Sequence, residues 1–370
     1  MQKFKSVEQI VNQLKPEKPV YCIRKNSIQS AVKYFKNNFP GKILYAVKTN
    51  PLPVVIEKII ESGVEQFDVA SIEEIKTIRN FSKTAKCSYM HTVKSRENIK
   101  EAYFKYGVKT FSLDTKDELI KIIESTNSAK DLELFLRVSV SNEHAEIDLS
   151  KKFGALTSEA VGLVRLVKQN AKKIGLSFHV GSQCTNIKNW IDGIQSAKSI
   201  FVQLEASGWT PELLNLGGGY PVQFTGKEPS IAEIGEAISK ELETIPQSIQ
   251  VMAEPGRFLA GSAGCLVTQV VGLATRDEKR WLYLDTGTYG GLMELADGFH
   301  SNIISQRTGE TGMWTMAGPT CDSIDVFGEH RLPTNMEVED VVFITNLGAY
   351  CTTCACDFNG FPVPKLVMVD

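Results

Sequence analysis

Residues 42–81 read KILYAVKTNPLPVVIEKIIESGVEQFDVASIEEIKTIRNF, and this stretch decides the fold. Its apolar pattern alternates between short runs rich in β-branched and aromatic residues, 42–48 and 66–70, and longer segments with helical spacing, 52–62 and 72–81. The pattern predicts strand, helix, strand and helix in turn. Because parallel neighbours need a crossover between them, such a repeat predicts a parallel sheet.

The same alternation continues along the chain to about residue 254. Capping-box patterns at Ser71-x-x-Glu74 and Thr115-x-x-Glu118 mark two of the predicted helix starts. Eight predicted strands are enough to close a (β/α)8 barrel, while a doubly wound open sheet is the alternative that counting alone leaves open. The further predicted strands are 87–91, 109–113, 132–138, 175–181, 213–217 and 249–254, and the further predicted helices are 95–106, 116–126, 158–173, 187–207 and 231–244.

The helical spacing ends near residue 262, and the remaining chain has short strand-like runs such as CLVTQVVGLATR and DVVFITN. We therefore predict an α/β protein with two domains. One is a barrel over residues 22–262, and the other is a β-rich domain built from residues 1–21 together with 263–370.

The composition of the chain excludes several classes of protein. With 370 residues, 42% hydrophobic and 23% charged, it has the make-up of a globular protein. A net charge of −2, from 41 basic and 43 acidic residues, gives no electrostatic reason to expect nucleic acid or an anionic membrane as partner. The N-terminal stretch lacks the apolar core of a signal peptide, and no apolar run reaches membrane-spanning length. We expect a cytoplasmic protein.

The 8 cysteines are then expected as thiols rather than disulfides. Three of them follow the spacing Cys351-x-x-Cys354-x-Cys356. A zinc site would need a fourth ligand, so we instead expect these residues to continue a strand and pack as small apolar side chains. No bound metal is expected.

Ionisable residues and glycines collect at the predicted strand ends. In a barrel the loops after the strands build one face, which is where catalytic residues gather. Read in chain order, the strand ends carry Lys48, Asp68, His91, Asp114, Arg137, His179, Gly217-Gly218-Gly219 and Glu254.

The loops after the last two predicted strands suggest a phosphate site. Gly217-Gly218-Gly219 would let backbone amides approach phosphate oxygens, and Glu254-Pro255-Gly256-Arg257 adds a charged fork. A simple tight turn is the alternative for the glycines. Neither the G-x-G-x-x-G nor the G-x-x-x-x-G-K-[ST] motif is present where it would be needed, so a compact phosphorylated cofactor is favoured.

Lys48 and Glu254 give that cofactor a chemical identity. A lysine in an apolar barrel mouth would have a destabilised ammonium, and its free amine could condense with an aldehyde. An exposed strand-end lysine is the alternative. A carboxylate such as Glu254 keeps a pyridine nitrogen protonated, as pyridoxal phosphate requires. His179 could lie against the cofactor ring or be a buried structural histidine, and Ser182 could reach the phosphate or cap a helix.

At these residues the sequence resembles the fold type III pyridoxal-phosphate decarboxylases, the ornithine/diaminopimelate/arginine decarboxylase family. The resemblance implies an alanine-racemase-like barrel, a β-rich domain and a homodimer that shares its active sites. The matching motifs are YAVKTNP (45–51), FDVAS (67–71), KFGA (152–155), FHVGSQC (178–184), LGGGYP (216–221), AEPGRF (253–258), GPTCDSID (318–325), GAY (348–350) and FNGF (358–361).

The resemblance also assigns roles by motif position. Lys48 would be the Schiff-base lysine, Glu254 would face the pyridine nitrogen and His179 would stack on the ring. Cys321 would protonate the substrate α-carbon and Asp322 would bind the distal amine, both in the partner subunit's site. The cofactor pocket would be completed by Asp68, Arg137, Ser182, Gly217, Gly218, Gly219, Gly256, Arg257 and Tyr350.

The substrate is expected to be a basic amino acid, L-ornithine first and lysine close behind. Asp322 suits a terminal cation and would repel a terminal carboxylate. The segment GLMELADG departs from the Tyr-Asp pair of eukaryotic ornithine decarboxylases, so Glu294 or Asp297 are further candidates for the amine contact, and Tyr289 is a candidate for the cofactor or interface. An amino-acid racemase on the same fold and an inactive, antizyme-inhibitor-like binding protein are the two rival hypotheses.

Overall fold

The structure is a computed structural model that describes residues 3–4, 9, 11, 18–140, 145–147, 151–206, 208–209 and 212–369. The chain divides into two compact units. The barrel unit comprises residues 32–221 and 228–256, and the β unit comprises residues 1–31, 222–227 and 257–370. The units divide within the helix Lys25–Asn38 (α2) and between Gly256 and Arg257. The domain boundaries that we predict from the sequence, at residues 22 and 262, stay a prediction.

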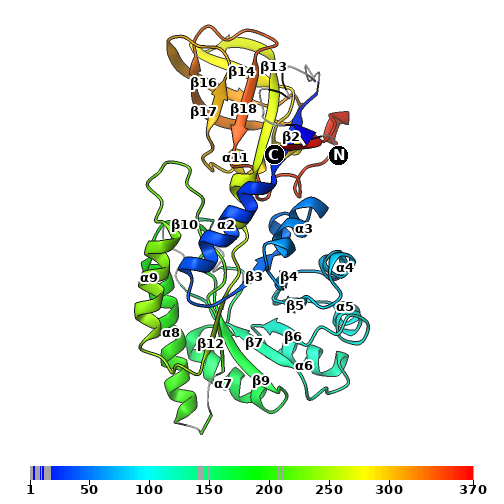
Figure 1. The fold of residues 1–370 in the computed structure, drawn as a ribbon, viewed down its shortest axis with the longest axis vertical. Coiled ribbons are helices and arrows are strands. Elements are labelled where there is room, and N and C mark those ends of the chain that lie inside the picture. The colour runs from blue at the N-terminus through cyan, green and yellow to red at the C-terminus, as the bar shows by residue number, and fades with distance from the viewer. Residues whose placement is uncertain are drawn as a thin grey trace. The chain divides into compact units, whose positions relative to one another are not determined.

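Eight parallel strands among the described residues close into a barrel (Figure 1). Closure is made where the last strand pairs with the first, with Met252 opposite Lys42. The barrel prediction is therefore confirmed, and the open-sheet alternative is excluded. The strands are Lys42–Ala46 (β3), Gln66–Val69 (β4), Lys86–Tyr89 (β5), Thr110–Leu113 (β6), Glu133–Arg137 (β7), Lys173–Ser177 (β9), Leu213–Asn215 (β11) and Gln250–Ala253 (β12).

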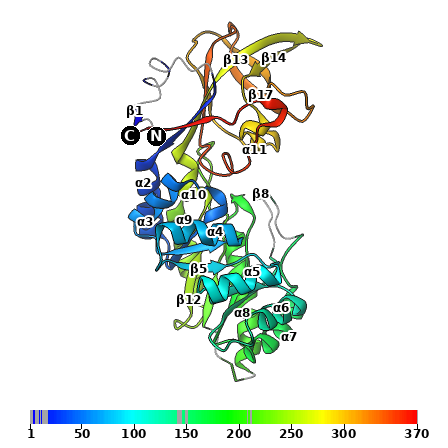
Figure 2. The same cartoon turned by 90° about the vertical axis from the view of Figure 1, so that its right-hand side faces the viewer.

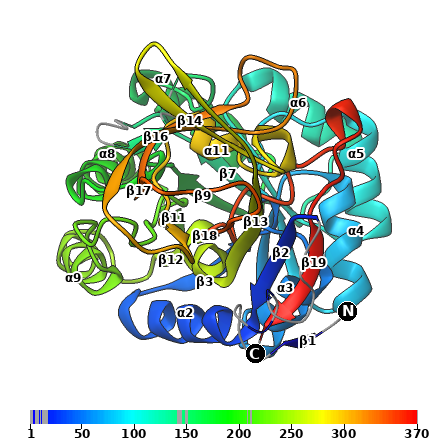
Figure 3. The same cartoon turned by 90° about the horizontal axis from the view of Figure 1, so that it is seen from above.

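Helices surround these strands, as Figures 2 and 3 show. Their apolar faces pack inward, as the buried residues Ile72, Ile75 and Ile78 of one helix illustrate. The helices are Pro53–Glu61 (α3), Ile72–Phe81 (α4), Arg96–Lys100 (α5), Lys116–Ser125 (α6), Thr157–Lys168 (α7), Lys188–Glu205 (α8) and Ile231–Leu242 (α9). A π-helical turn, Glu101–Lys105 (η2), continues α5. Ala145–Ile147 (β8) and Ser182–Cys184 (β10) form a separate antiparallel pair of strands.

The predicted capping boxes are only half formed. The Ser71 and Thr115 hydroxyls accept hydrogen bonds from the backbone N–H of Glu74 and Glu118, as expected. The return bonds are missing, because Glu74 accepts from the N–H of Ala70 and the carboxylate of Glu118 pairs with lysines. The complete box lies at Ser230 and Glu233, at the start of α9, where the sequence analysis did not place one.

The β unit is built around a long strand, Gly264–Arg276 (β13). Its first half pairs with Val20–Arg24 (β2) and with Val341–Thr345 (β18), and its second half pairs with Lys279–Leu284 (β14). Val20, Cys22, Val267 and Val367 are among the residues of its core. The remaining elements are Lys3–Phe4 (β1), Ile303–Ser305 (β15), Thr311–Ala317 (β16), Val326–Pro333 (β17), Lys365–Val369 (β19), Arg257–Ala260 (α10), Met293–Ala296 (α11) and the 3-10 turns Gly261–Ala263 (η3), Thr288–Gly290 (η4) and Phe358–Gly360 (η5).

The prediction that Cys351, Cys354 and Cys356 continue a strand is wrong. Tyr350 has a positive φ of 53°, and the N–H of Cys354 bonds to the carbonyl of Cys351, so the chain turns there. Cys351 is buried, Cys354 is half-buried and Cys356 is exposed. No described helix has both the length and the apolar content that a bilayer crossing demands.

Candidate active site

Lys48 and Asp68 form an ion pair at the mouth of the barrel. Lys48 lies in a 3-10 turn, Val47–Thr49 (η1), that directly follows β3, and Asp68 lies in the neighbouring strand β4. The Lys48 side chain is 41% exposed, whereas that of Asp68 is 1% exposed. The expected apolar surroundings of Lys48 are therefore wrong, since its amine is held by a buried carboxylate. The second carboxylate oxygen of Asp68 is buried and has no hydrogen-bond partner among the described residues.

Glu254 follows strand β12 and is buried at the same mouth. The side-chain amide of Asn215 donates a hydrogen bond of 2.7 Å to its Oε1 atom. Burial, and next the charge of Asp68, raise the pKa of Glu254 to about 7, although Lys48 and Asn215 act in the opposite direction. A carboxylate with this pKa can accept or return a proton near neutral pH.

The glycine loop packs closely against the loop that carries His179. Gly217 has a φ of 66°, and a Cβ atom there would come 2.1 Å from the carbonyl oxygen of Phe178. A Cβ at Gly218 would lie 2.9 Å from both the carbonyl oxygen of Glu254 and Nε2 of His179. The loop is therefore more than a tight turn: it brings bare backbone against two site residues.

The backbone amides of Gly218 and Gly219 have no acceptor within the part of the chain that the structure describes. The amide of Gly217, by contrast, donates to Oδ1 of Asn215 over 2.9 Å. Two open amides beside a compact glycine backbone fit a phosphate oxygen cradle.

His179 is held as a neutral imidazole. Its Nδ1 atom accepts a hydrogen bond of 3.0 Å from the N–H of Gly181. Burial, together with the nearby charges of Arg137 and Lys48, holds the pKa of His179 well below its usual value. A neutral ring can lie against an aromatic cofactor without the cost of a desolvated charge.

Arg137 ends strand β7 and is half-buried. Burial lowers the pKa of Arg137, while the carboxylates of Glu254, Asp114 and Asp68 favour its charged form. The guanidinium lies 5.5 Å from the ring centre of Phe153. Arg137 thus supplies a positive charge that partly balances the acidic side of the barrel mouth.

The structure also places Ser182 and Gly256. Ser182 begins strand β10 and pairs in register with Ile147 of β8. A Cβ at Gly256 would come 2.0 Å from Oγ1 of Thr49, so only glycine fits beside the turn that carries Lys48. Gly256 therefore has a local structural reason that is independent of any ligand.

A second group of predicted residues lies in the β unit. The guanidinium of Arg257 forms a two-pronged ion pair with Glu294, one bond being 2.7 Å long. The same guanidinium lies 4.5 Å from the ring centre of Phe299 and 5.1 Å from that of Tyr350. Glu294 is thus engaged by the arginine rather than left open, and Asp297 is exposed.

Cys321 and Asp322 lie on a loop that Asp325 holds at its base. Asp325 is 2% exposed, and its carboxylate accepts hydrogen bonds from the N–H of Thr288 and from the N–H and hydroxyl of Thr320. At the tip, the Tyr289 hydroxyl donates to Asp322 over 2.5 Å, and this bond raises the pKa of Tyr289 to about 12. Cys321 is an exposed free thiol.

Sequence reasoning missed several residues of the site. Asn215 bridges the glycine loop and Glu254, and the available signal was an amide at the end of the otherwise apolar strand 213–215. Lys94 and Glu118 form a buried ion pair of 2.9 Å behind the loop after β5. Nothing in the sequence pairs these two residues, because they are separated by 24 positions and lie on different elements.

These side chains fit pyridoxal phosphate. An amine paired with a carboxylate, a buried carboxyl with a near-neutral pKa and two open glycine amides correspond to an aldehyde, a pyridine nitrogen and a phosphate, respectively. The unpartnered oxygen of Asp68 provides a further acceptor for a polar group of the cofactor.

Comparison with known proteins agrees with this chemistry. Residues 25–261 match the family described as "Pyridoxal-dependent decarboxylase, pyridoxal binding domain". The chain is 30% identical over 353 residues to a lysine/ornithine decarboxylase of Selenomonas ruminantium, covering 93% of this chain and 88% of the relative. It is 31% identical over 345 residues to antizyme inhibitor 2 of Xenopus laevis, covering 86% of this chain and 74% of the relative.

A solved structure, the lysine/ornithine decarboxylase from Vibrio vulnificus complexed with putrescine, superimposes with a TM-score of 0.87 at 30% identity, covering 99% of both chains. The geometry of the barrel mouth, the family match and the structural likeness agree. The chain belongs to the fold type III pyridoxal-phosphate-dependent decarboxylases, and pyridoxal phosphate is its cofactor.

Proposed function

We propose that this enzyme removes the α-carboxylate of L-ornithine to give putrescine, with lysine as the next-best substrate. The observation that carries the proposal is the buried carboxyl of Glu254 in the same barrel mouth as Lys48. A racemase of this fold places an arginine at the pyridine nitrogen, whereas a carboxylate there keeps the ring protonated. The protonated cofactor supplies the electron sink for the carbanion left by carbon dioxide.

Each barrel residue has a proposed task in this reaction. Lys48 would bind the cofactor aldehyde through its amine with loss of water, and Asp68 would accept a hydrogen bond from the free amine. Glu254 holds a proton at the pyridine nitrogen, and Asn215 keeps the carboxylate oriented toward it. His179 packs against the ring as an uncharged plate, and Arg137 offsets the negative charge of the carboxylates.

The phosphate is proposed to be held by the amides of Gly218 and Gly219, by Ser182 and by Arg257, with Gly217, Gly256 and Tyr350 shaping the surrounding backbone and ring. The guanidinium of Arg257 is a group that binds phosphate well, and its ion pair with Glu294 holds it in place. Glu294 therefore orients the arginine and is a weaker candidate for the substrate amine than Asp322.

Substrate preference is proposed from the acidic loop and from the relatives. The relatives include a lysine/ornithine decarboxylase and an enzyme solved with putrescine, so a terminal amine is the common feature of their ligands. Asp322, fixed by Tyr289, offers a carboxylate to such an amine. We propose that the protein works as a homodimer in which Cys321 and Asp322 serve the partner subunit's site, where Cys321 returns a proton to the substrate α-carbon.

The proposal is tested by carbon dioxide release from L- and D-ornithine, L-lysine, L-arginine and diaminopimelate. We expect the highest kcat/KM for L-ornithine, followed by L-lysine. Higher kcat/KM with diaminopimelate would overturn the substrate assignment, and formation of D-ornithine without carbon dioxide would show a racemase. Cys321→Ala should keep the cofactor and lose correct α-carbon protonation, whereas Lys48→Ala should lose the covalent bond to the cofactor.

A second function is favoured by the likeness to the antizyme inhibitor of Xenopus. A binding protein of that kind would not need the cofactor. Purified protein should absorb near ~420 nm if Lys48 holds pyridoxal phosphate. Absence of that band together with absence of carbon dioxide release would support the binding protein and refute the enzyme.

A further inference from the structure

The N-terminal end of the barrel, opposite the active-site mouth, contains a recessed polar cavity of about 210 Å³. Each of the eight barrel strands contributes its first or nearly first residue to the wall, including Lys42 of β3, Lys86 of β5 and Lys173 of β9. A layer of inward-pointing strand residues in such a barrel is normally made of branched apolar side chains. Here it is occupied mainly by ammonium, amide and hydroxyl groups.

An apolar layer separates this cavity from the active site. Leu44, Phe135 and Met252 belong to a buried cluster in the barrel interior. Each lies two residues after a cavity residue on its own strand, so it points to the same side of the sheet one layer higher. The cavity is therefore a compartment of its own and not the lower part of the cofactor site.

The charges in the cavity do not balance. Three lysines face a single carboxylate, Glu133, which pairs with Lys86 over 2.5 Å and accepts a hydrogen bond of 2.9 Å from the hydroxyl of Thr110. Partial burial works against ionisation, but Lys86 and, less directly, Lys173 lower the pKa of Glu133. One pair is thus satisfied, and two positive charges remain.

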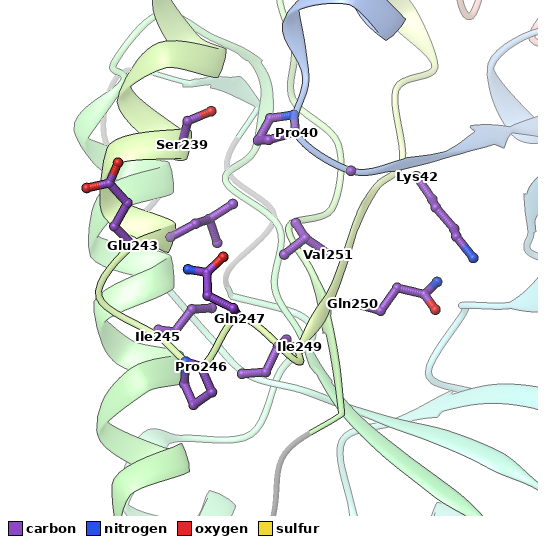
Figure 4. Close-up of a pocket in the computed structure, with 12 residues that line it drawn as sticks. Pro40, Lys42, Ser239, Glu243, Ile245, Pro246, Gln247, Ile249, Gln250 and Val251 are labelled. Carbon is purple, nitrogen blue, oxygen red and sulfur yellow. The ribbon is translucent and has the colours of Figure 1, made fainter.

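Those two charges belong to Lys42 and Lys173. Neither ammonium group has a hydrogen-bond or ion-pair partner within the described ranges of the chain. Figure 4 shows the side chains of Lys42 and Gln250 extending away from the α9 residues Ser239 and Glu243. Both residues also line the larger, partly apolar cavity of about 390 Å³ between α9 and the strand ends that this figure draws.

The surroundings reinforce the positive potential. A neighbouring cavity shares Lys86 with the first one and adds Arg79, Lys109 and Lys172, against Asp131. Such an excess of basic groups at one end contrasts with the chain's net charge of −2. A recess with low-dielectric walls and one sign of charge concentrates counter-ions of the opposite sign.

We propose that this cavity is a binding site for a small multivalent oxyanion of the phosphate class. Lys42 and Lys173 supply point charges, and Gln66 and Gln250 are placed to supply neutral donors. A bound oxyanion would link non-adjacent strands of the barrel and would stabilise the folded chain increasingly as its concentration rises. The small volume favours a free ion over a macromolecular polyanion.

The test uses the holoenzyme, because pyridoxal phosphate then fills the phosphate position of the active site. Inorganic phosphate and pyrophosphate are titrated calorimetrically at constant ionic strength, with chloride as the balancing ion. We expect one saturable site per chain. Lys42→Gln and Lys173→Gln should each weaken binding by about tenfold, the effect of losing one charged hydrogen bond. Glu133→Gln should strengthen binding, because it removes the carboxylate that competes with the ion.

Lys240→Gln is the matched control, since Lys240 is exposed on α9 and does not line the cavity. Equal weakening by this variant would show a general charge effect and overturn the proposal. Absence of saturable heat would do so too, as would binding that disappears on adding excess pyridoxal phosphate, which would place the ion in the cofactor site. Binding of heparin but not of phosphate, with the same dependence on Lys42 and Lys173, would replace the small ion by a macromolecular partner. Unchanged cofactor content and thermal unfolding in chloride show that each variant is folded.

Discussion

Asn215→Ala should raise the pKa of Glu254 and move proton uptake at this carboxyl out of the neutral range. The amide of Asn215 donates the 2.7 Å bond to the Glu254 carboxylate. A hydrogen bond to a charged group contributes about 1.5–3 kcal/mol, and about 1.4 kcal/mol corresponds to one pKa unit. Losing the bond therefore raises the pKa from about 7 by about one to two units.

Infrared spectroscopy of the apoprotein measures this directly, through the band of the protonated carboxyl group as pH is varied. Glu254→Gln, which lacks the group, assigns the band. Asn215→Asp separates loss of the bond to Glu254 from loss of the bond to the glycine loop. It keeps an acceptor for the N–H of Gly217 but adds a like charge beside Glu254. We expect the midpoint to rise from the unaltered protein to Asn215→Ala and further to Asn215→Asp.

An unchanged midpoint in Asn215→Ala would refute this reasoning, and so would an Asp variant that behaves like the unaltered protein.

The raised pKa of Glu254 also sets how this group changes the stability of the folded protein with pH. The folded-state pKa of Glu254 lies above its ordinary value of 4.5, so the folded protein holds a proton that the unfolded chain has lost. The contribution of this group to apoprotein stability is complete below about pH 4.5 and is lost as pH rises through about 7.

Two further changes test the packing of the site. Gly218→Ala should lower cofactor affinity with little change in fold, because its Cβ would press on the carbonyl of Glu254 and on His179. Equilibrium dialysis with pyridoxal phosphate measures this affinity. An unaltered affinity would contradict the assignment of the glycine loop as the phosphate site. Lys94→Met should lower the free energy of unfolding in urea by about 3 kcal/mol at most, because it removes the buried ammonium beside Glu118 and leaves only the partly exposed Lys121 to pair with that carboxylate. Lys94→Met/Glu118→Leu should recover most of that loss. A double variant no more stable than the single one would show that the pair is not what matters.

The parallel sheet covered by helices was predictable from the alternation of short apolar runs and helical segments. Eight strands allowed a closed barrel, but only the pairing of β12 with β3 excludes an open sheet. The strand ends were less predictable. The predicted strand 42–48 stops at Ala46, since Lys48 leaves the sheet in a 3-10 turn to reach Asp68. Likewise 175–181 stops at Ser177, because the chain must turn back for Gly181 to meet His179.

Local sequence patterns could not predict which side chains pair between distant elements of the fold. Glu118 fits a capping box by spacing, yet a buried ammonium, that of Lys94, competes for its carboxylate and wins. Glu294 was predicted to face the substrate, whereas the structure engages it with Arg257. In each case an ion pair between residues far apart in the sequence outweighs a local preference. The spacing of residues in the sequence does not predict such a pair.

The loop that carries Cys321 combines a buried base with an exposed tip. Asp325 leaves no room around it, because a side chain on Gly287 or Gly318 would collide with its carboxylate. The intervening Ser323 and Ile324, by contrast, face solvent. Variation at the tip could therefore retune which molecule the thiol meets while the frame beneath stays constant, so related enzymes would be expected to diverge at 323 and 324 long before they diverge at 287, 318 or 325.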